Sequence, residues 1–391
     1  MFRFADSLEC EDIENFGLFL RGSSDCDRWS KASRPKDSVQ SRLYRLKLSL
    51  AKRGRPSGLE SFTPANLRHT TALDPRAFEG FDVINIHYIG GLLWNIDELF
   101  QLVPKETKLF VTMHDLNFIT GGCHYPDGCS AYLNGCERCP QLPGVGGASL
   151  CRRSFEIKAQ TYASRDFSII APSKWLYNCA TQSRLGSFAK QIELIRNPFR
   201  LSRSLLSRQE CRANNFSDVK EKWIVLVIAQ NPNIARKGFA LVVDILKKNL
   251  LDSAHFVMMG SEIDFAHPRL PQLGFVSDRD KIRRIYASAN VLALPSIEEN
   301  LAQTGLEALR EGTPVVCFEN TGPQDYTIEG ETGVVCPQPT SGSLAEGLLR
   351  CLSSPMLASQ EHVRAVFKRL YDKEYKPEVV RRNYSTLFQK S

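Results

Sequence analysis

Two series of short apolar segments, with helical stretches between most of them, constrain the fold of this chain more than any other feature. They cover residues 81–90, 108–115, 167–173 and 192–199 in the first series, and 223–231, 255–261, 291–296 and 314–318 in the second. Buried β-branched runs that alternate with amphipathic helices are typical of parallel sheets with crossover helices. The sequence therefore predicts an α/β fold of two doubly wound units. Most segments end in polar residues, at the sheet edge where such folds bind ligands.

A polar stretch after Asn197 and Pro198 separates the two series and predicts a domain junction near residue 200. The 391 residues suit two domains of about 150 to 200 residues each. Residues 377–391 have the pattern of a terminal helix.

Composition excludes several classes of protein. No run of about 18 apolar residues could span a bilayer, and acidic residues near the N-terminus stand where a secretory signal would be basic and then apolar. Twelve cysteines in a long chain without such a signal predict reduced thiols and a cytoplasmic location. The formal charge of +7 suits anionic substrates or an anionic membrane face. No basic stripe interleaves with aromatic residues, so no nucleic-acid partner is expected.

Residues 41–55 predict an amphipathic helix with Leu43, Leu46 and Leu50 on one face and basic side chains largely elsewhere. Such a helix can lie on a membrane surface, peripheral to the inner face of the cell membrane. The alternative is a solvated helix that packs its leucines on the sheet.

Segment 294–318 reads as a strand, a turn, a short helix, a glycine stop and a second strand. The unpaired N–H groups and positive dipole end of the helix would form an anion site suited to a diphosphate. Glu299 before the helix and Glu307 within it could face two parts of one ligand, because carboxylates accept hydrogen bonds from vicinal hydroxyls of a sugar or ribose. The alternative is that both are surface glutamates. The loop residues are Glu299, Asn300, Leu301 and Ala302.

Two cations follow the first strand of the second series. Arg236 and Lys237 can neutralise a diphosphate at that strand end, and Gly238 would allow close backbone approach. On its own, the sequence Arg-Lys-Gly is weak evidence for a phosphate site. Here, however, it follows a strand of the same predicted unit as the glutamates, at the strand end where one ligand could contact both.

These residues resemble glycosyltransferase family 4 of the GT-B fold, over about residues 80–391, and are similar to bacterial exopolysaccharide enzymes such as those of colanic-acid synthesis. The resemblance implies two Rossmann-like domains facing a central cleft. We expect an acceptor-side domain over 1–198, a nucleotide-sugar-binding domain over 199–376 and a helix over 377–391 that crosses back to the first domain. It further implies that Glu299 approaches the transferred sugar, that Glu307 holds the ribose, that Arg236 and Lys237 bind phosphate, and that the backbone near Gly274, Phe275 and Val276 meets the base. From the residues alone, the stretch 273–296 predicts only a strand, a turn and an amphipathic helix.

The implied activity is transfer of a hexosyl group, with retention, from a UDP- or GDP-sugar to a saccharide acceptor that can be lipid-linked, in surface polysaccharide synthesis. No cofactor is expected to be needed for catalysis. One alternative is a catalytically impaired nucleotide-binding or partner protein of the same fold. The other is an epimerase that acts on the nucleotide-sugar itself.

Segment 111–144 closely resembles the same exopolysaccharide subgroup and implies that His114 meets the donor sugar or the acceptor hydroxyl. A histidine at a strand end is as often structural. Acceptor-side candidates from this and two other strand ends are Asp115, His87, Ser173 and Lys174.

Four cysteines, Cys123, Cys129, Cys136 and Cys139, lie in the glycine-rich loop 121–144. Four thiolates satisfy tetrahedral zinc, and the closing C-x2-C pair has knuckle spacing, so structural zinc is one interpretation. Unligated small side chains or redox-labile thiols are the alternatives.

One departure from the family concerns the N-terminus. Family members begin with a strand and a glycine-rich loop, whereas residues 16–21 look more like the second strand. The first strand of the N-terminal domain is therefore expected to be missing, with loss of acceptor contacts, unless the start of the chain is misassigned.

Overall fold

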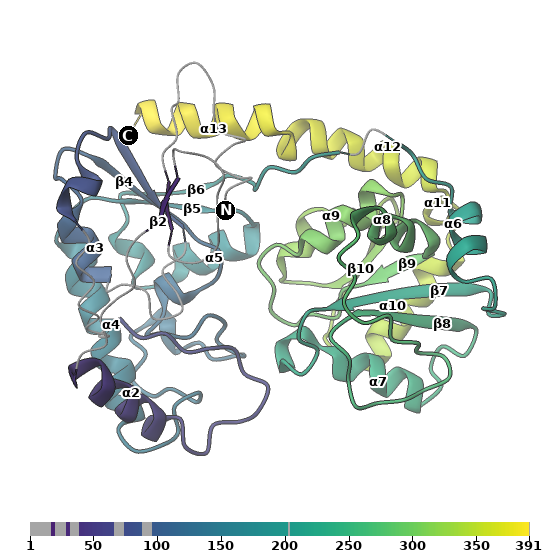
Figure 1. The fold of residues 1–391 in the computed structure, drawn as a ribbon, viewed down its shortest axis with the longest axis horizontal. Helices are drawn as coiled ribbons and strands as arrows, with labels where there is room; N and C mark the ends of the chain where they lie inside the picture. Colours follow the sequence, from purple (N-terminus) through teal and green to yellow (C-terminus); the bar gives the residue numbers. More distant parts are fainter. Residues whose placement is uncertain are drawn as a thin grey trace. The chain divides into compact units, whose positions relative to one another are not determined.

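The computed structural model describes residues 17–19, 29–31, 39–65, 74–87, 96–201 and 204–390. Contacts within the chain divide it into two compact units (Figure 1). Unit 1 comprises Met1–Pro198 with Pro377–Ser391, and unit 2 comprises Phe199–Lys376.

Unit 1 is built on a parallel four-stranded sheet in the order β3-β4-β5-β6. The strands are β3 (Val83–Ile86), β4 (Lys108–Thr112), β5 (Ser168–Ala171) and β6 (Gln191–Leu194). Each lies within or beside a predicted apolar segment, so this series of strands is confirmed. The accompanying helices are α2 (Val39–Ala51), α3 (Ile96–Leu102), α4 (Gly147–Ala163) and α5 (Lys174–Gln182), with 3-10 turns at Pro75–Phe78, Asn117–Ile119, Ala131–Leu133 and Gly186–Phe188.

Two further strands near the N-terminus pair with each other in parallel. They are β1 (Gly17–Phe19) and β2 (Trp29–Lys31), and they form a separate two-stranded sheet. A strand is therefore present within the predicted residues 16–21, but β1 belongs to the sheet with β2 and not to the four-stranded sheet. The expected loss of an earlier strand concerns residues 1–16, which lie outside the described residues.

The C-terminal helix α13 (Pro377–Lys390) packs on the sheet of unit 1 and lies along it in Figure 1. Its buried Val380, Tyr384 and Leu387 form one cluster with apolar side chains of the sheet region. Burial of an aliphatic or aromatic side chain of this size contributes about 1.5 to 3 kcal/mol, so this helix is held by apolar packing.

Unit 2 is a parallel five-stranded sheet in the order β11-β10-β9-β7-β8. The strands are β7 (Trp223–Ala229), β8 (Ala254–Gly260), β9 (Val291–Ala293), β10 (Val315–Phe318) and β11 (Gly333–Cys336). The chain starts in the middle at β7, adds β8 on one side and then continues on the other side from β9. The topological switch point, where open α/β sheets bind ligands, therefore lies between the carboxyl ends of β7 and β9.

The helices of unit 2 surround a core that is continuous across the whole sheet. They are α6 (Arg208–Asn215), α7 (Phe239–Lys247), α8 (Arg279–Ser288), α9 (Gln303–Arg310), α10 (Ser341–Ser353), α11 (Pro355–Ala358) and α12 (Gln360–Leu370), with 3-10 turns at Ala235–Lys237 and Gly322–Asp325 and a π-helical turn at Tyr371–Tyr375.

The strand expected before α8, near residues 273–276, is wrong. This segment runs beside β8, where the Leu273 N–H donates to the Met258 carbonyl oxygen at 2.8 Å, but it forms only an isolated bridge at Gln272. Gly274 adopts φ +67°, a left-handed conformation that interrupts a regular strand.

Candidate functional site

The switch point of unit 2 brings together the residues that follow β7 and β9. Arg236 and Lys237 lie in the 3-10 turn Ala235–Lys237, and Glu299 lies between β9 and α9. The Ile297 N–H donates to the Arg236 carbonyl oxygen at 2.7 Å, which ties the two loops together. The backbone therefore holds both cations beside the loop that carries Glu299.

The carboxylate of Glu299 accepts hydrogen bonds from both cations. Its Oε2 lies 2.6 Å from Lys237 Nζ and 3.4 Å from Arg236 Nη1. Arg236 also donates to the Glu298 carbonyl oxygen at 2.9 Å. Arg236 and Glu299 are buried, whereas the Lys237 side chain is 28% exposed. One carboxylate against two cations leaves a local excess of positive charge, which favours an anionic ligand.

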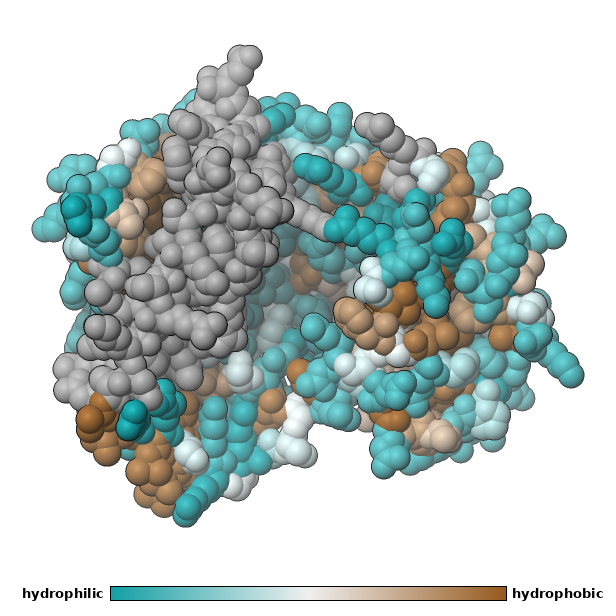
Figure 2. Space-filling view, in the orientation of Figure 1, coloured by the Kyte–Doolittle hydropathy of each residue, from teal (hydrophilic) through white to brown (hydrophobic). Residues whose placement is uncertain are grey.

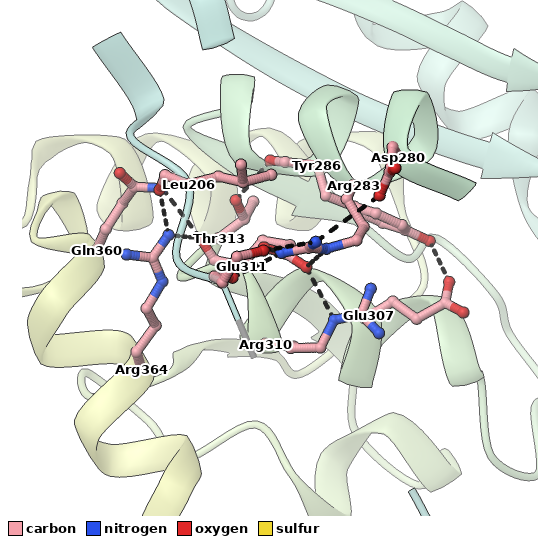
Figure 3. Close-up of polar contacts among 11 residues, drawn as sticks. Leu206, Asp280, Arg283, Tyr286, Glu307, Arg310, Glu311, Thr313, Gln360 and Arg364 are labelled. Atoms are coloured by element: carbon pink, nitrogen blue, oxygen red, sulfur yellow. Dashed lines mark hydrogen bonds and ion pairs between the residues drawn. The ribbon is translucent and has the colours of Figure 1, made fainter. Parts of the chain in front are cut away.

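Glu307 lies on α9 and is positioned by a tyrosine of α8. The Tyr286 hydroxyl donates to Glu307 Oε2 at 2.9 Å (Figure 3). Beside this pair, the buried Glu311 accepts from Arg283 Nε and Arg310 Nε, each at 2.8 Å. This ion cluster links α8 to the end of α9, so the helix that carries Glu307 has a defined position.

The loop before α9 is packed against the rest of unit 2. Asn300 and Leu301 are buried, and a Cβ at Gly322 would lie 1.2 Å from the Asn300 carbonyl oxygen. Ala302 is the N-cap of α9 and forms no side-chain cap hydrogen bond. The N–H groups of the first turn are therefore not satisfied by a cap and suit an anion.

Gly238 brings its turn close to the end of β9. It adopts φ +65°, and a Cβ there would lie 1.8 Å from the Pro295 carbonyl oxygen. The close approach that requires glycine is therefore to the end of β9, within the protein. Of the residues predicted to meet the base, Phe275 is 81% exposed, Val276 packs against the core of unit 2, and the Gly274 carbonyl oxygen accepts from the Gly260 N–H at 3.0 Å.

In unit 1, the two predicted histidines contact each other. His87 Nδ1 and His114 Nε2 are 3.0 Å apart, and the rings stack. Loss of hydration lowers the pKa of His87 to about 3, with a further contribution from His114, and it also lowers the pKa of His114. Both rings are therefore neutral at pH 7, so one of them can donate this hydrogen bond and the other accept it.

Asp115 supports the loop that follows it. Its Oδ2 lies 2.8 Å from His124 Nδ1, and His124 Nε2 lies 2.9 Å from Thr63 Oγ1. Through His124, Asp115 is therefore linked to the side chain of Thr63. The predicted contact of Ser173 with an acceptor is wrong, because Ser173 is fully buried and caps α5 by accepting from the Leu176 N–H at 3.1 Å. Lys174, the next residue, is exposed.

The four predicted cysteines line one small cavity of about 10 Å³ together with a fifth, Cys151 of α4. Cys151 is hydrogen-bonded to Cys136 and Cys139, and this contact is the main cause that lowers the pKa of Cys139 to about 7. All five are free thiols. Within the described ranges, no group of three or more His, Cys, Asp or Glu side chains already stands in a metal-binding arrangement.

The predicted amphipathic helix is α2, and two of the three leucines predicted on its apolar face are exposed, whereas Leu50 is half-buried. Leu43 and Leu46 are 54% and 57% exposed, while Leu48 and Ala51 are buried instead. Figure 2 shows hydrophobic surface at the lower left, where Figure 1 draws α2. A cavity of about 730 Å³ adjoins this face between α2 and α4. Among the described residues, no helix has the length and apolar character to cross a membrane.

Sequence reasoning missed three contributors to these sites. Tyr286, His124 and Cys151 lie in segments whose local pattern is that of an ordinary helix or loop. The one signal that could have identified His124 is its position directly after Cys123 in the cysteine loop.

Comparison with known proteins finds a family model that covers the candidate site of unit 2. Residues 207–366, which contain Arg236, Lys237, Glu299 and Glu307, match the family model described as glycosyl transferases group 1. The lipopolysaccharide core biosynthesis glycosyltransferase LpsE of Rhizobium meliloti is 28% identical over 118 residues, or 28% of this chain. The matched segment spans only 34% of the length of that relative.

Solved structures resemble the chain over most of its length. Sucrose-phosphate synthase from Thermosynechococcus elongatus has a TM-score of 0.60 at 16% identity and covers 96% of this chain and 98% of its own. Anabaena HepE in complex with UDP-glucose has a TM-score of 0.58 at 14% identity, covering 96% of this chain and 99% of its own. The predicted GT-B fold of two parallel-sheet α/β domains is confirmed by these likenesses.

Proposed function

We propose that this chain transfers a hexosyl group, with retention of anomeric configuration, from a UDP- or GDP-sugar to a saccharide acceptor in surface polysaccharide synthesis. The observation that carries the proposal is the cluster of Arg236, Lys237 and Glu299 at the switch point of unit 2, inside the segment that matches group 1 glycosyl transferases. Relatives described as binding UDP-glucose or as building lipopolysaccharide support the same chemistry.

In this proposal, the diphosphate of the donor binds Arg236, Lys237 and the uncapped N-terminus of α9. Lys237 has three N–H donors, so it can bind phosphate while Glu299 keeps one of them. Glu307, held by Tyr286, accepts from the ribose hydroxyls, and Glu299 faces the transferred sugar.

The reaction is assigned to front-face attack. The acceptor oxygen bonds to the anomeric carbon on the face from which the diphosphate leaves, the carbon–oxygen bond to the diphosphate breaks, and the diphosphate takes the acceptor proton. The protein supplies position and charge stabilisation, and the cations lower the energy of the departing diphosphate. His114 of unit 1 contributes a neutral imidazole toward the donor sugar or the acceptor hydroxyl.

The acceptor is assigned to the membrane surface. Leu43 and Leu46 on α2 and Val145 nearby are exposed, and α2 carries Arg42, Arg45 and Lys47 without any acidic residue. Apolar side chains flanked by cations match an anionic lipid surface. A lipid-linked saccharide would be presented there, on the cytoplasmic side.

The test is a transfer assay with the purified full chain, a panel of UDP- and GDP-sugars, and saccharide or lipid-linked acceptors. The expected result is nucleotide diphosphate release that depends on an acceptor, with the anomeric configuration of the product unchanged by NMR. Donor turnover without any acceptor would instead favour the epimerase. Tight UDP binding with no turnover on any donor would favour the catalytically impaired protein.

A further inference from the structure

The cysteine-rich part of unit 1 contains a cluster of thiols that the proposed sugar transfer does not use. Three of the four loop cysteines, Cys123, Cys136 and Cys139, come from an irregular segment between β4 and α4, and Cys151 comes from α4 itself. They line one cavity of about 10 Å³, which is about the size of a single small ion or water molecule.

The sulfur atoms converge through direct contacts. Cys151 is hydrogen-bonded to both Cys136 and Cys139. A Cβ on Gly121 would lie 2.7 Å from Cys151 Sγ and 3.2 Å from Cys136 Cβ, so glycine is required there for the two cysteines to meet. Cys136 itself adopts φ +51°, a backbone conformation that non-glycine residues rarely hold without a reason.

Backbone donors also point at the sulfurs. The Gly121 N–H donates to Cys136 Sγ at 3.3 Å, and the N–H groups of Gln141 and Leu142 donate to Cys139. Donation from the second and third residues after a cysteine folds the chain around its sulfur. N–H donors of this kind stabilise a charged sulfur, as metal ligation requires.

Two cations, Lys158 and Arg55, lie near the cluster. Lys158 is 1% exposed, and its Nζ donates to the carbonyl oxygens of Asn117 and Thr120. The described part of the chain offers Lys158 no carboxylate in ion-pair contact, although a buried ammonium is costly when it is not compensated. The electrostatic neighbours of Lys158 are Cys123, Cys136, Asp115 and Cys151. Those of Arg55 are Cys139, Cys123 and Glu60.

We propose that Cys123, Cys136, Cys139 and Cys151 bind one structural zinc ion. Cys151 of α4 is chosen as a ligand because it contacts both Cys136 and Cys139, and Cys129, which also lines the cavity, is left outside the set. Four thiolates and Zn²⁺ carry a net charge of −2, which Lys158 and Arg55 offset. The thiols have to lose their protons to solvent, and the four sulfur atoms have to lie about 2.3 Å from one common centre. The ion would fasten α4 to the irregular loop and would close the site to water, so its role is structural.

The experiment measures zinc in the full chain purified without chelators, by mass spectrometry of the metal. We expect about one zinc per chain in the wild type, the same content in Cys129→Ser and in the remote control Cys179→Ser, and loss of most zinc in Cys151→Ser. Cobalt substitution of the wild type gives an independent readout, because ligation by four thiolates produces an intense near-ultraviolet charge-transfer band.

The wild-type measurements keep the proposal falsifiable even where Cys151→Ser fails to fold. Wild-type protein that holds less than about a tenth of an equivalent of zinc, and that gives no cobalt–thiolate band, overturns the site. A disulfide among these cysteines in the purified chain also overturns it. Zinc lost from Cys129→Ser but kept by Cys151→Ser overturns the ligand set.

Discussion

Replacement of Lys237 by methionine tests the donor site most directly, because methionine keeps most of the unbranched side chain and removes the ammonium group with its charge and its N–H donors. The Lys237 ammonium lies 2.6 Å from Glu299 Oε2 and is 28% exposed. A charge-assisted hydrogen bond contributes about 1.5 to 3 kcal/mol, so loss of one such bond to the diphosphate should weaken UDP binding about 10- to 150-fold. Turnover of the donor should fall further, by about 100-fold or more, because charge on the leaving diphosphate grows in the transition state.

The same substitution should lower the free energy of unfolding by about 1 to 3 kcal/mol, because Glu299 stays buried with Arg236 as its remaining cation. Adding Glu299→Gln should recover part of this stability, since a neutral amide needs less compensation, but it should not restore UDP binding. Calorimetry with UDP and urea unfolding separate the two effects. Lys248→Met, which breaks an exposed pair with Asp244 at 2.9 Å, is the matched control.

The Lys237→Met protein must first be shown by urea titration to be folded. If it then binds UDP with a Kd within twofold of the wild-type value, the assignment of Lys237 to the diphosphate is refuted. A loss of binding that the added Glu299→Gln fully rescues would equally refute it, because the lysine would then serve only to neutralise the carboxylate.

Three further variants test the remaining sites. Tyr286→Phe removes the hydroxyl that holds Glu307 at 2.9 Å and should weaken UDP binding about five- to tenfold; unchanged binding would show that Glu307 does not need this contact. The folded pKa of His87, about 3, is below its unfolded value, so its stability contribution is full above pH 6.5 and is lost as the pH falls toward 3. Wild type should therefore lose up to about 2 kcal/mol more than His87→Asn between pH 7 and pH 5 in urea unfolding, and equal losses would contradict this. Leu43→Asp with Leu46→Asp should abolish sedimentation with anionic lipid vesicles but leave UDP binding unchanged; persistent sedimentation would exclude α2 as the contact.

Local pattern was sufficient to predict most of the secondary structure. The β-branched runs that became β7 and β10 are buried on both faces of a parallel sheet, and such runs are recognisable because few other structures bury every consecutive side chain. The segment near Gly274 was mispredicted because it pairs with β8 only at an isolated bridge and then meets a left-handed residue, and neither feature can be read from apolar side chains alone. Leu43 and Leu46 show a second limit of sequence patterns. The helical periodicity predicted an apolar face, but it did not predict whether other parts of the protein cover that face.

By itself, the sequence determined which residue types stand at the ends of strands, and strand order then decided which of them meet. Arg236, Lys237 and Glu299 were predicted from their positions after two strands, and they meet because β7 and β9 are neighbours at the switch point. Only the tertiary structure decided that Tyr286 holds Glu307 and that Cys151 joins the loop cysteines. Those contacts join separate structural elements, so a local sequence pattern cannot predict them. They form only when whole helices pack against neighbouring helices or loops.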